Sequence, residues 1–168
     1  MAESFNAAQY LLHRHLDEGR GAHVAVTGSA DRLTYADLST LVRHVSAAYR
    51  GLGLRRDDRV VLVASDDVPM LASILGGFHT GLVAVPISTM FTGAELGKII
   101  ADSGARLVVC TEEFTAAVVE ALEAAPDVEF VVGVGDLGPL AGPHPYVVHE
   151  WEPFVGLGAA SYSAEPGN

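Results

Sequence analysis

Residues Phe78 to Glu95 read FHTGLVAVPISTMFTGAE, which combines the end of one helix, a strand and the start of a second helix. Gly81 can close the first helix in a left-handed conformation, because it has no Cβ. Pro86 cannot donate a hydrogen bond to a sheet, so the strand must end close to it. Thr92 and Glu95 have the spacing of a capping box, which predicts a helix start. The alternating apolar residues of the strand are Val83, Val85 and Ile87.

The same alternation of strand and helix extends on both sides of this stretch. The run RVVLVA at Arg59 to Ala64 is apolar throughout, which is typical of a parallel strand buried on both faces. The pattern predicts an α/β fold: a three-layer, Rossmann-like, mostly parallel sheet with right-handed crossovers and helices on both faces. The other predicted strands are Val83 to Ile87, Arg106 to Cys110 and Val128 to Val132, and the predicted helices between them are Val68 to Thr80, Thr92 to Asp102 and Glu112 to Ala124.

The first 55 residues predict a helix, a hairpin and a second, longer helix. The first helix begins near Ser4 and carries Phe5 on its apolar face, with Ala8, Leu12 and Leu16. Two short β-like runs, His23 to Thr27 and Arg32 to Thr34, flank a turn and predict the hairpin. Thr34 and Asp37 form a capping box for the long helix, whose apolar residues are Leu38, Leu41, Val42, Val45, Tyr49 and Leu52.

We expect one N-terminal α/β subdomain over residues 1–158 and an exit segment over 159–168. After Val132 the chain becomes rich in Gly, Pro and His as far as Pro145, and its last ten residues are small and polar. This composition is typical of loops and linkers.

Composition excludes several classes of function. The net charge of −11 opposes binding to nucleic acids and to anionic membranes. Cys110 is the single cysteine, so no internal disulfide can form. No apolar run approaches the ~20 residues of a membrane span, and the start of the chain has no signal-peptide pattern. We therefore expect a cytoplasmic protein.

One glycine motif resembles a nucleotide fingerprint but has the wrong context. Gly133 to Gly138 matches G-x-G-x-x-G after a predicted strand. A pyrophosphate site needs a helix to begin at the third glycine, and the prolines at Pro139, Pro143 and Pro145 oppose one. We therefore expect a glycine-rich loop and no cofactor-binding residue.

Neither histidine pair has the spacing of a metal site. His13 and His15 lie two apart on a predicted helix and point in different directions, and His144 and His149 come with no cysteine or acidic motif. Hydrolase, zinc-protease and Walker motifs are also absent from the sequence. We therefore expect no metal ligand and no catalytic residue.

Polar residues follow three predicted strands at the edge where open α/β sheets bind ligands. Asp66–Asp67 and Glu112–Glu113 could serve a ligand, but carboxylates are also favoured in the first turn of a helix. The weak candidates for substrate binding are Ser88, Thr89, Met90 and Phe91, which could line a cleft or form a plain loop.

Five stretches in order resemble the adenylate-forming (AMP-binding) acyl-CoA synthetase superfamily, and most of all its benzoate, aryl- and acyl-CoA ligases. Adenylation domains of peptide synthetases are a poorer match, because a tyrosine is missing before Val85 and Ser88 follows Ile87. The stretches are FNAAQYLL at the start, Leu33 to Leu38 (LTYADL), Asp58 to Val63 (DRVVLV), Thr80 to Glu95, and Asp102 to Arg106 (DSGAR).

The resemblance implies the N-terminal subdomain of a ligase that converts a carboxylic acid and ATP to an acyl-adenylate and pyrophosphate, and then to a CoA thioester. ATP, CoA and Mg would serve the complete enzyme, and none would bind this chain alone. The family's working residues have no counterpart here, so the chain should be a silent scaffold that packs against the rest of the ligase. The alternative is a stand-alone α/β module that binds a nucleotide or small molecule. Whether the acid is benzoate-like or a medium-chain aliphatic stays open, and a homo-oligomer is compatible with the sequence.

Overall fold

The computed structural model describes residues 6–163, which divide into two compact units. The first unit comprises residues 1–56, 66–82 and 155–168, and the second comprises residues 57–65 and 83–154. The predicted helix start near Ser4 and the apolar residue Phe5 lie outside the described residues.

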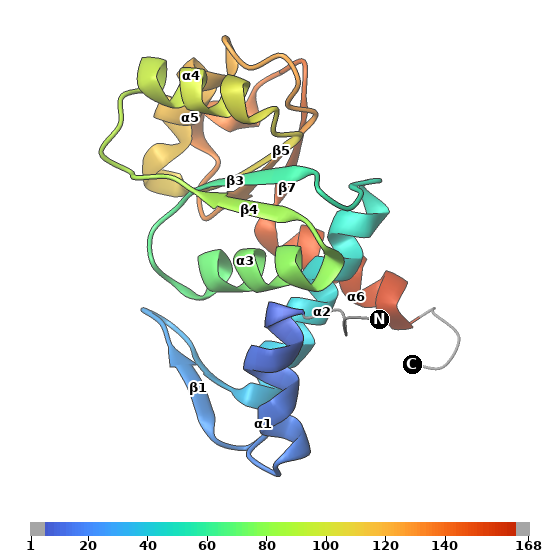
Figure 1. Cartoon of the computed structure of the whole chain (residues 1–168). Helices are drawn as coiled ribbons and strands as arrows, with labels where there is room; N and C mark the ends of the chain where they lie inside the picture. Colours follow the sequence, from blue (N-terminus) through green and yellow to red (C-terminus); the bar gives the residue numbers. More distant parts are fainter. Residues whose placement is uncertain (1–5, 164–168) are drawn as a thin grey trace. The chain divides into compact units, whose positions relative to one another are not determined.

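The second unit is built on a five-stranded sheet in which every neighbouring pair is parallel. The strand order is β4-β3-β5-β6-β7 (Figure 1). All five residues of β5 are buried, so both faces of the sheet are covered at its centre. The predicted α/β fold with a parallel sheet is confirmed. The strands are β3 (Arg59–Val63), β4 (Val83–Pro86), β5 (Leu107–Thr111), β6 (Phe130–Val134) and β7 (Val147–Glu150).

Two helices, α4 (Gly93–Ser103) and α5 (Thr115–Leu122), lie side by side over one face of this sheet (Figure 1). A Cβ on Gly97 would lie 2.8 Å from the carbonyl oxygen of Ala121, so the glycine is what lets the helices approach. Short 3₁₀ turns, η2 (Glu112–Phe114) and η3 (Gly138–Ala141), follow β5 and β6. The core beneath the helices includes Val61, Val63, Leu96, Ile100, Val108, Val118 and Val131.

The first unit contains the predicted hairpin and the long helix. Its core groups Leu12, Leu38, Val42 and Leu75. Helices α2 and α3 approach closely at Gly76, where an added Cβ would meet Val45 at 2.7 Å. The elements are η1 (Gln9–His13, a π-helix), α1 (Arg14–Asp17), β1 (Val24–Thr27), β2 (Arg32–Thr34), α2 (Tyr35–Gly51), α3 (Val68–Thr80) and most of α6 (Trp151–Ser163).

The start and stop signals predicted from the sequence are confirmed. Thr34 and Thr92 each form a complete capping box, with Asp37 and Glu95 respectively. Gly81 closes α3 at φ +80°, a conformation that side chains with a Cβ rarely adopt. Pro86 is the last residue of β4, as its missing N–H requires.

Two elements were not predicted, the strand β7 and the helix α6. Residues 151–158 were assigned no element, and the small, polar residues from 159 onward predicted an exit segment. In the structure Gly158 lies against the backbone carbonyl of His44, where a side chain would overlap α2. Helix α6 continues through Ser163, and residues 164–168 lie outside the described part of the chain. That residues 159–168 form an exit segment therefore stays a prediction, as does the single-subdomain boundary at residue 158.

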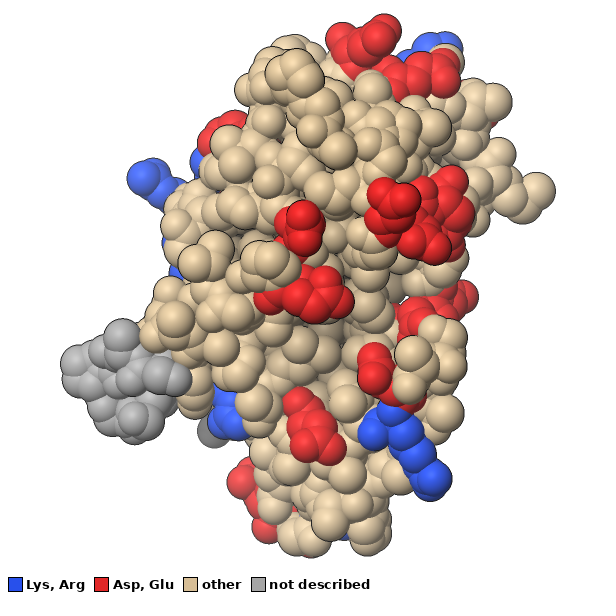
Figure 2. All heavy atoms as spheres, turned by 180° about the vertical axis from the view of Figure 1, so that it is seen from behind, with Lys and Arg blue, Asp and Glu red and all other residues tan. Residues whose placement is uncertain are grey.

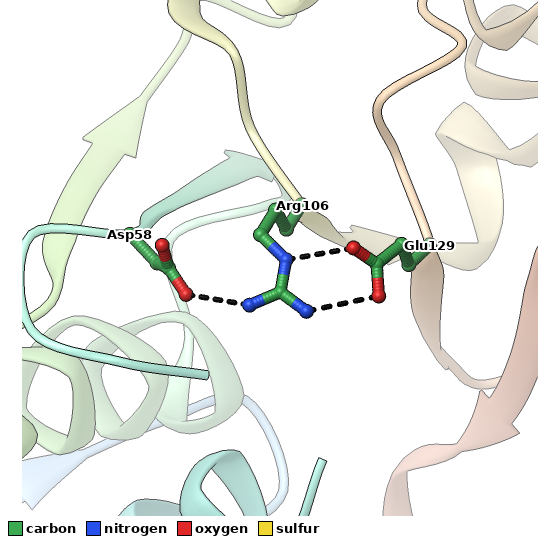
Figure 3. Close-up of polar contacts among 3 residues, drawn as sticks. All are labelled: Asp58, Arg106 and Glu129. Carbon is green, nitrogen blue, oxygen red and sulfur yellow. Dashed lines mark hydrogen bonds and ion pairs between the residues drawn. The ribbon is translucent and has the colours of Figure 1, made fainter. Parts of the chain in front are cut away.

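A planar fork of hydrogen bonds joins the starts of three strands in the second unit (Figure 3). Arg106, just before β5, donates from Nη1 to Asp58 Oδ2 at 2.7 Å and from Nε and Nη2 to the two Glu129 oxygens at 2.8 and 2.9 Å. Asp58 precedes β3 and Glu129 precedes β6, the two neighbours of β5. The Arg106 and Asp58 side chains are only 28% and 24% exposed, which limits solvent screening.

We predict that replacing Arg106 by alanine lowers the melting temperature by a few degrees at pH 7. The Arg106 hydrogen bonds hold the pKa of Glu129 below its ordinary value of 4.5. A carboxyl whose pKa is lowered on folding stabilises the fold above its unfolded pKa, and this contribution disappears as the pH falls through the folded value. The difference in melting temperature between wild type and Arg106→Ala, followed by circular dichroism, should therefore shrink below pH 4.5.

Arg59→Ala is the matched control, because it removes one positive charge from an exposed neighbouring side chain. An equal loss in Arg59→Ala, or a difference that is unchanged in acid, would show that the fork is not the cause.

Candidate functional site

Hydrogen bonds connect the carboxyl ends of β3 and β5, where the sequence predicted a candidate site. The backbone N–H of Ser65 donates to Thr111 Oγ1 at 3.1 Å. The Ser65 hydroxyl donates to the carboxylate of Glu113, which belongs to the second acidic pair. This link between strand ends was not predicted; the polar residues that end both strands were the only signal for it.

The side chains of this network are suited to holding the strand ends together and are not suited to catalysis. The hydrogen bond from Ser65 is the main cause that lowers the pKa of Glu113, which makes the carboxylate a weaker base. Burial in β5 raises the pKa of the Cys110 thiol to about 12, so the thiolate nucleophile is unavailable at neutral pH. Ser65 has no histidine among its hydrogen-bond partners to activate it.

The carboxylate of Glu112 closes the glycine-rich loop after β6. The backbone N–H of Asp136 donates to Glu112 Oε2 at 2.9 Å. Gly135 has φ +84° and lies so close to that carboxylate that an added Cβ would overlap it. No α-helix begins at the third glycine: η3 is a four-residue 3₁₀ turn that begins at Gly138. The loop thus binds a carboxylate of its own chain at the position that a phosphate would need.

The first acidic pair lies in the first unit and has a structural task. Asp67 is the N-cap of α3 and accepts a hydrogen bond from the Val68 N–H at 2.7 Å. It also accepts from the backbone N–H and the hydroxyl of Ser29, in the hairpin turn, and the hydroxyl contact is the main cause that lowers the pKa of Asp67. Asp67 thus attaches the hairpin to α3, which supports the structural interpretation for this member of the pair.

A cavity of ≈ 220 Å³ lies beside this contact in the first unit. Its walls are mainly apolar and come from the hairpin and α3. The lining residues include Val26, Thr27, Asp66, Met70, Leu71 and Ile74.

Ser88, Thr89, Met90 and Phe91 form an exposed loop after β4. Met90 is 91% exposed, and its backbone N–H donates to Ser88 Oγ at 3.3 Å. Substrate binding by these four residues remains a prediction, since neither described cavity includes them.

In each of the two histidine pairs noted in the sequence, the two side chains contact different residues. The rings of His13 and His79 lie 5.9 Å apart, while His15 stacks on Tyr35 at 4.0 Å. His144 stacks on Tyr146, and burial lowers the pKa of His149. Over residues 6–163, no three His, Cys, Asp or Glu side chains come together as a group that could hold a metal ion.

Acidic side chains outnumber basic ones on the face drawn in Figure 2, in keeping with the net charge of −11. Among the described helices, none has the length and apolar character needed to cross a membrane.

The parallel sheet and the ordered motifs fit a known family model. The model of the AMP-binding enzyme matches residues 13–150. The chain belongs to this AMP-binding enzyme family. The matched region takes in the whole sheet and both acidic pairs.

Several members of the family that resemble this chain are acid–CoA ligases. The 4-hydroxybenzoate–CoA/benzoate–CoA ligase of Rhodopseudomonas palustris is 30% identical over 79% of this chain and 24% of that protein. The benzoate–CoA ligase of Thauera aromatica is 31% identical over 81% of this chain and 26% of that protein. The chain thus spans about a quarter of the length of these relatives.

Solved structures of the family share the fold. A benzoate CoA ligase from Burkholderia xenovorans LB400 superposes on 91% of this chain and 28% of its own, with a TM-score of 0.76 and 27% identity. An anthranilate CoA ligase in complex with anthranoyl-AMP superposes on 95% of this chain, with a TM-score of 0.80; at 24% identity it supports the fold alone.

The described residues do not fit the phosphates of ATP or CoA at the loop most similar to a phosphate site. Glu112 fills the glycine loop, and its negative charge would repel a phosphate. The α-helix N-terminus that normally faces a phosphate is also missing there. Membership of the family therefore does not make this loop a nucleotide site.

We predict that Glu112→Ala opens the loop. Loss of one hydrogen bond, worth about 1 kcal/mol, should speed hydrogen exchange of the Asp136 amide roughly fivefold. Amide-resolved NMR exchange measures this directly. Glu113→Ala is the control, because it removes the same charge from the next residue, whose carboxylate bonds Ser65. Equal acceleration in both variants would refute a specific role for Glu112.

Proposed function

We propose that this chain is the N-terminal scaffold of an AMP-forming carboxylic acid–CoA ligase. The complete enzyme would join an acid to ATP, release pyrophosphate, and transfer the acyl group to the thiol of CoA with release of AMP. The observation that carries the proposal is the family match over residues 13–150, together with relatives whose names include benzoate–CoA ligase.

A scaffold role fits the chemistry of the strand ends. Two carboxylates at the carboxyl edge, Glu112 and Glu113, are engaged in hydrogen bonds within the chain. The buried thiol of Cys110 holds its proton at neutral pH. These groups stabilise strand ends and loops, so the residues that act on ATP and the acid should lie in the rest of the ligase.

The names of the relatives favour an aromatic acid as the substrate. Benzoate, 4-hydroxybenzoate and 3-hydroxybenzoate ligases are among the proteins similar to this chain, together with a long-chain-fatty-acid–CoA ligase. ATP, CoA and Mg would serve the complete enzyme in the cytoplasm, and its macromolecular partner would be the rest of its own polypeptide.

Carboxylate-dependent exchange between ATP and labelled pyrophosphate tests the proposal. Residues 1–168 should give no exchange with benzoate, while the polypeptide read from the complete coding sequence should give exchange. Exchange by residues 1–168 alone would contradict the scaffold role. A complete polypeptide that is inactive with aromatic and aliphatic acids would contradict the ligase assignment.

The alternative, a stand-alone binding module, makes a different prediction. Residues 1–168 would then bind ATP, AMP, NAD or CoA saturably in calorimetry. We expect no such binding, because Glu112 occupies the glycine loop.

A further inference from the structure

The cavity of ≈ 220 Å³ beside the hairpin and α3 is walled mainly by apolar side chains of the first unit. Met70, Leu71 and Ile74 line it from α3, and all three are only half-buried. Ala72 of the same helix is fully buried, and Val26 lines the cavity from β1. Accessible apolar surface is thus gathered around one space, and covering that surface would be favourable.

The volume of the cavity sets the size of the group that it can hold. An apolar cavity of about 150 Å³ in a protein interior is large enough for benzene. The ≈ 220 Å³ of this cavity therefore suits one six-membered ring, or a short alkyl chain, that carries one polar group. Sites for drug-sized ligands measure roughly 300–1,000 Å³, so a nucleotide is too large for this space.

Two carboxylates line the cavity, and they differ in their partners. Asp67 accepts hydrogen bonds from the backbone N–H of Val68 and from the N–H and hydroxyl of Ser29. Asp66 is exposed and has no hydrogen-bond or ion-pair partner within residues 6–163. A ligand can therefore bind the Asp66 carboxylate without breaking a contact of the fold.

The charges around the cavity favour a cation over an anion. An ionised carboxylate only accepts hydrogen bonds, and an ammonium group has three N–H donors. One N–H can donate to Asp66, and a second can donate to the hydroxyl of Thr27, which also lines the cavity. The net charge of −11 attracts a cation and repels an anion such as benzoate. The cavity thus matches a ligand with an apolar body and a cationic end.

We propose that this cavity binds a small organic ammonium ion, with its apolar part against Met70, Leu71 and Ile74 and its ammonium group at Asp66. The acid substrates of the proposed ligase carry the opposite charge, so this site is separate from that reaction. A bound ion would contact the hairpin and α3 together, and it would stabilise the first unit by mass action.

A methyl-resolved NMR titration of residues 1–168 with benzylamine, which is a cation at pH 7, tests the proposal. The methyl signals of Met70 and Ile74 should shift and reach saturation. Benzyl alcohol is the neutral analogue of the same size, and it should bind about fivefold more weakly because it forms no ion pair. Benzoate should bind most weakly. Equal affinities for the amine and the alcohol, or shifts that do not saturate, would overturn the proposal.

A second cavity serves as the control for location. This groove of ≈ 510 Å³ lies in the second unit, and its lining also combines a carboxylate with apolar side chains. Its lining residues include Leu140, Tyr146 and Glu150. Shifts confined to the methyl signals of Leu140 would assign the ligand to the groove and overturn the proposal.

The same titration in the complete polypeptide should again shift the signals of Met70 and Ile74. Loss of this response would show that another segment covers the cavity, and would also overturn the proposal. Because pyrophosphate exchange is measured separately, the binding site and the ligase assignment can fail independently.

A matched pair of variants tests the role of the carboxylate. Asp66→Asn should weaken the binding of benzylamine about fivefold and leave the binding of benzyl alcohol unchanged. Asp17→Asn is the control, because it removes the same charge from an exposed side chain that does not line the cavity. Equal weakening in both variants would indicate an effect of net charge and contradict a site at Asp66.

Thermal unfolding gives an independent readout. Saturating benzylamine should raise the melting temperature of the wild type and of Asp17→Asn more than that of Asp66→Asn. Equal increases in all three proteins would contradict the proposal. If Asp66→Asn fails to fold, the comparison of benzylamine with benzyl alcohol in the wild type decides the question.

Discussion

The Arg106 fork is the interaction on which the order at the amino-terminal edge of the sheet depends. One guanidinium binds Asp58 and Glu129 and so connects the entries to β3, β5 and β6. The backbone of Arg106 strengthens the same junction, because its carbonyl oxygen accepts from the N–H groups of Glu129 and Phe130 at 2.9 and 3.1 Å. Parallel strands are connected only through distant crossovers, so a side chain that spans three of them fixes their starts directly.

Hydrogen bonds also connect strands at the opposite edge, but from different residue types. Ser65 and Thr111 link β3 to β5, and Glu112 links the η2 turn after β5 to the loop after β6. Open α/β sheets commonly bind ligands at this edge. Here the polar groups at the ends of β3 and β5 already form hydrogen bonds with each other. Such satisfied groups rigidify a scaffold, and they agree with a chain that covers about a quarter of its ligase relatives.

Local signals in the sequence predicted most of the fold. Capping boxes, the left-handed Gly81 and the strand end at Pro86 each depend on a few neighbouring residues, and all are confirmed. The strand β7 was missed because it has four residues and follows a segment rich in proline and glycine. Helix α6 was missed because the reason for Gly158 is a contact with His44, more than a hundred positions earlier.

The candidate site shows the same limit. The sequence predicted polar residues at the correct edge of the sheet. Their hydrogen-bond partners depend on the strand order, which local sequence patterns do not specify. Ser65 and Glu113 lie 48 positions apart, and so do Asp58 and Arg106. A charged residue directly before each of three strands was the only local trace of the fork.

The division into two units has a consequence for how the protein is made. The chain passes from one unit to the other four times, after residues 56, 65, 82 and 154. The first unit includes residues from 155 onward, so it lacks part of its own chain until that segment has been synthesised. The N-terminal hairpin and helices therefore cannot complete their packing until the segment after Phe154 is available, whereas all five strands of the second unit are available once Glu150 has emerged.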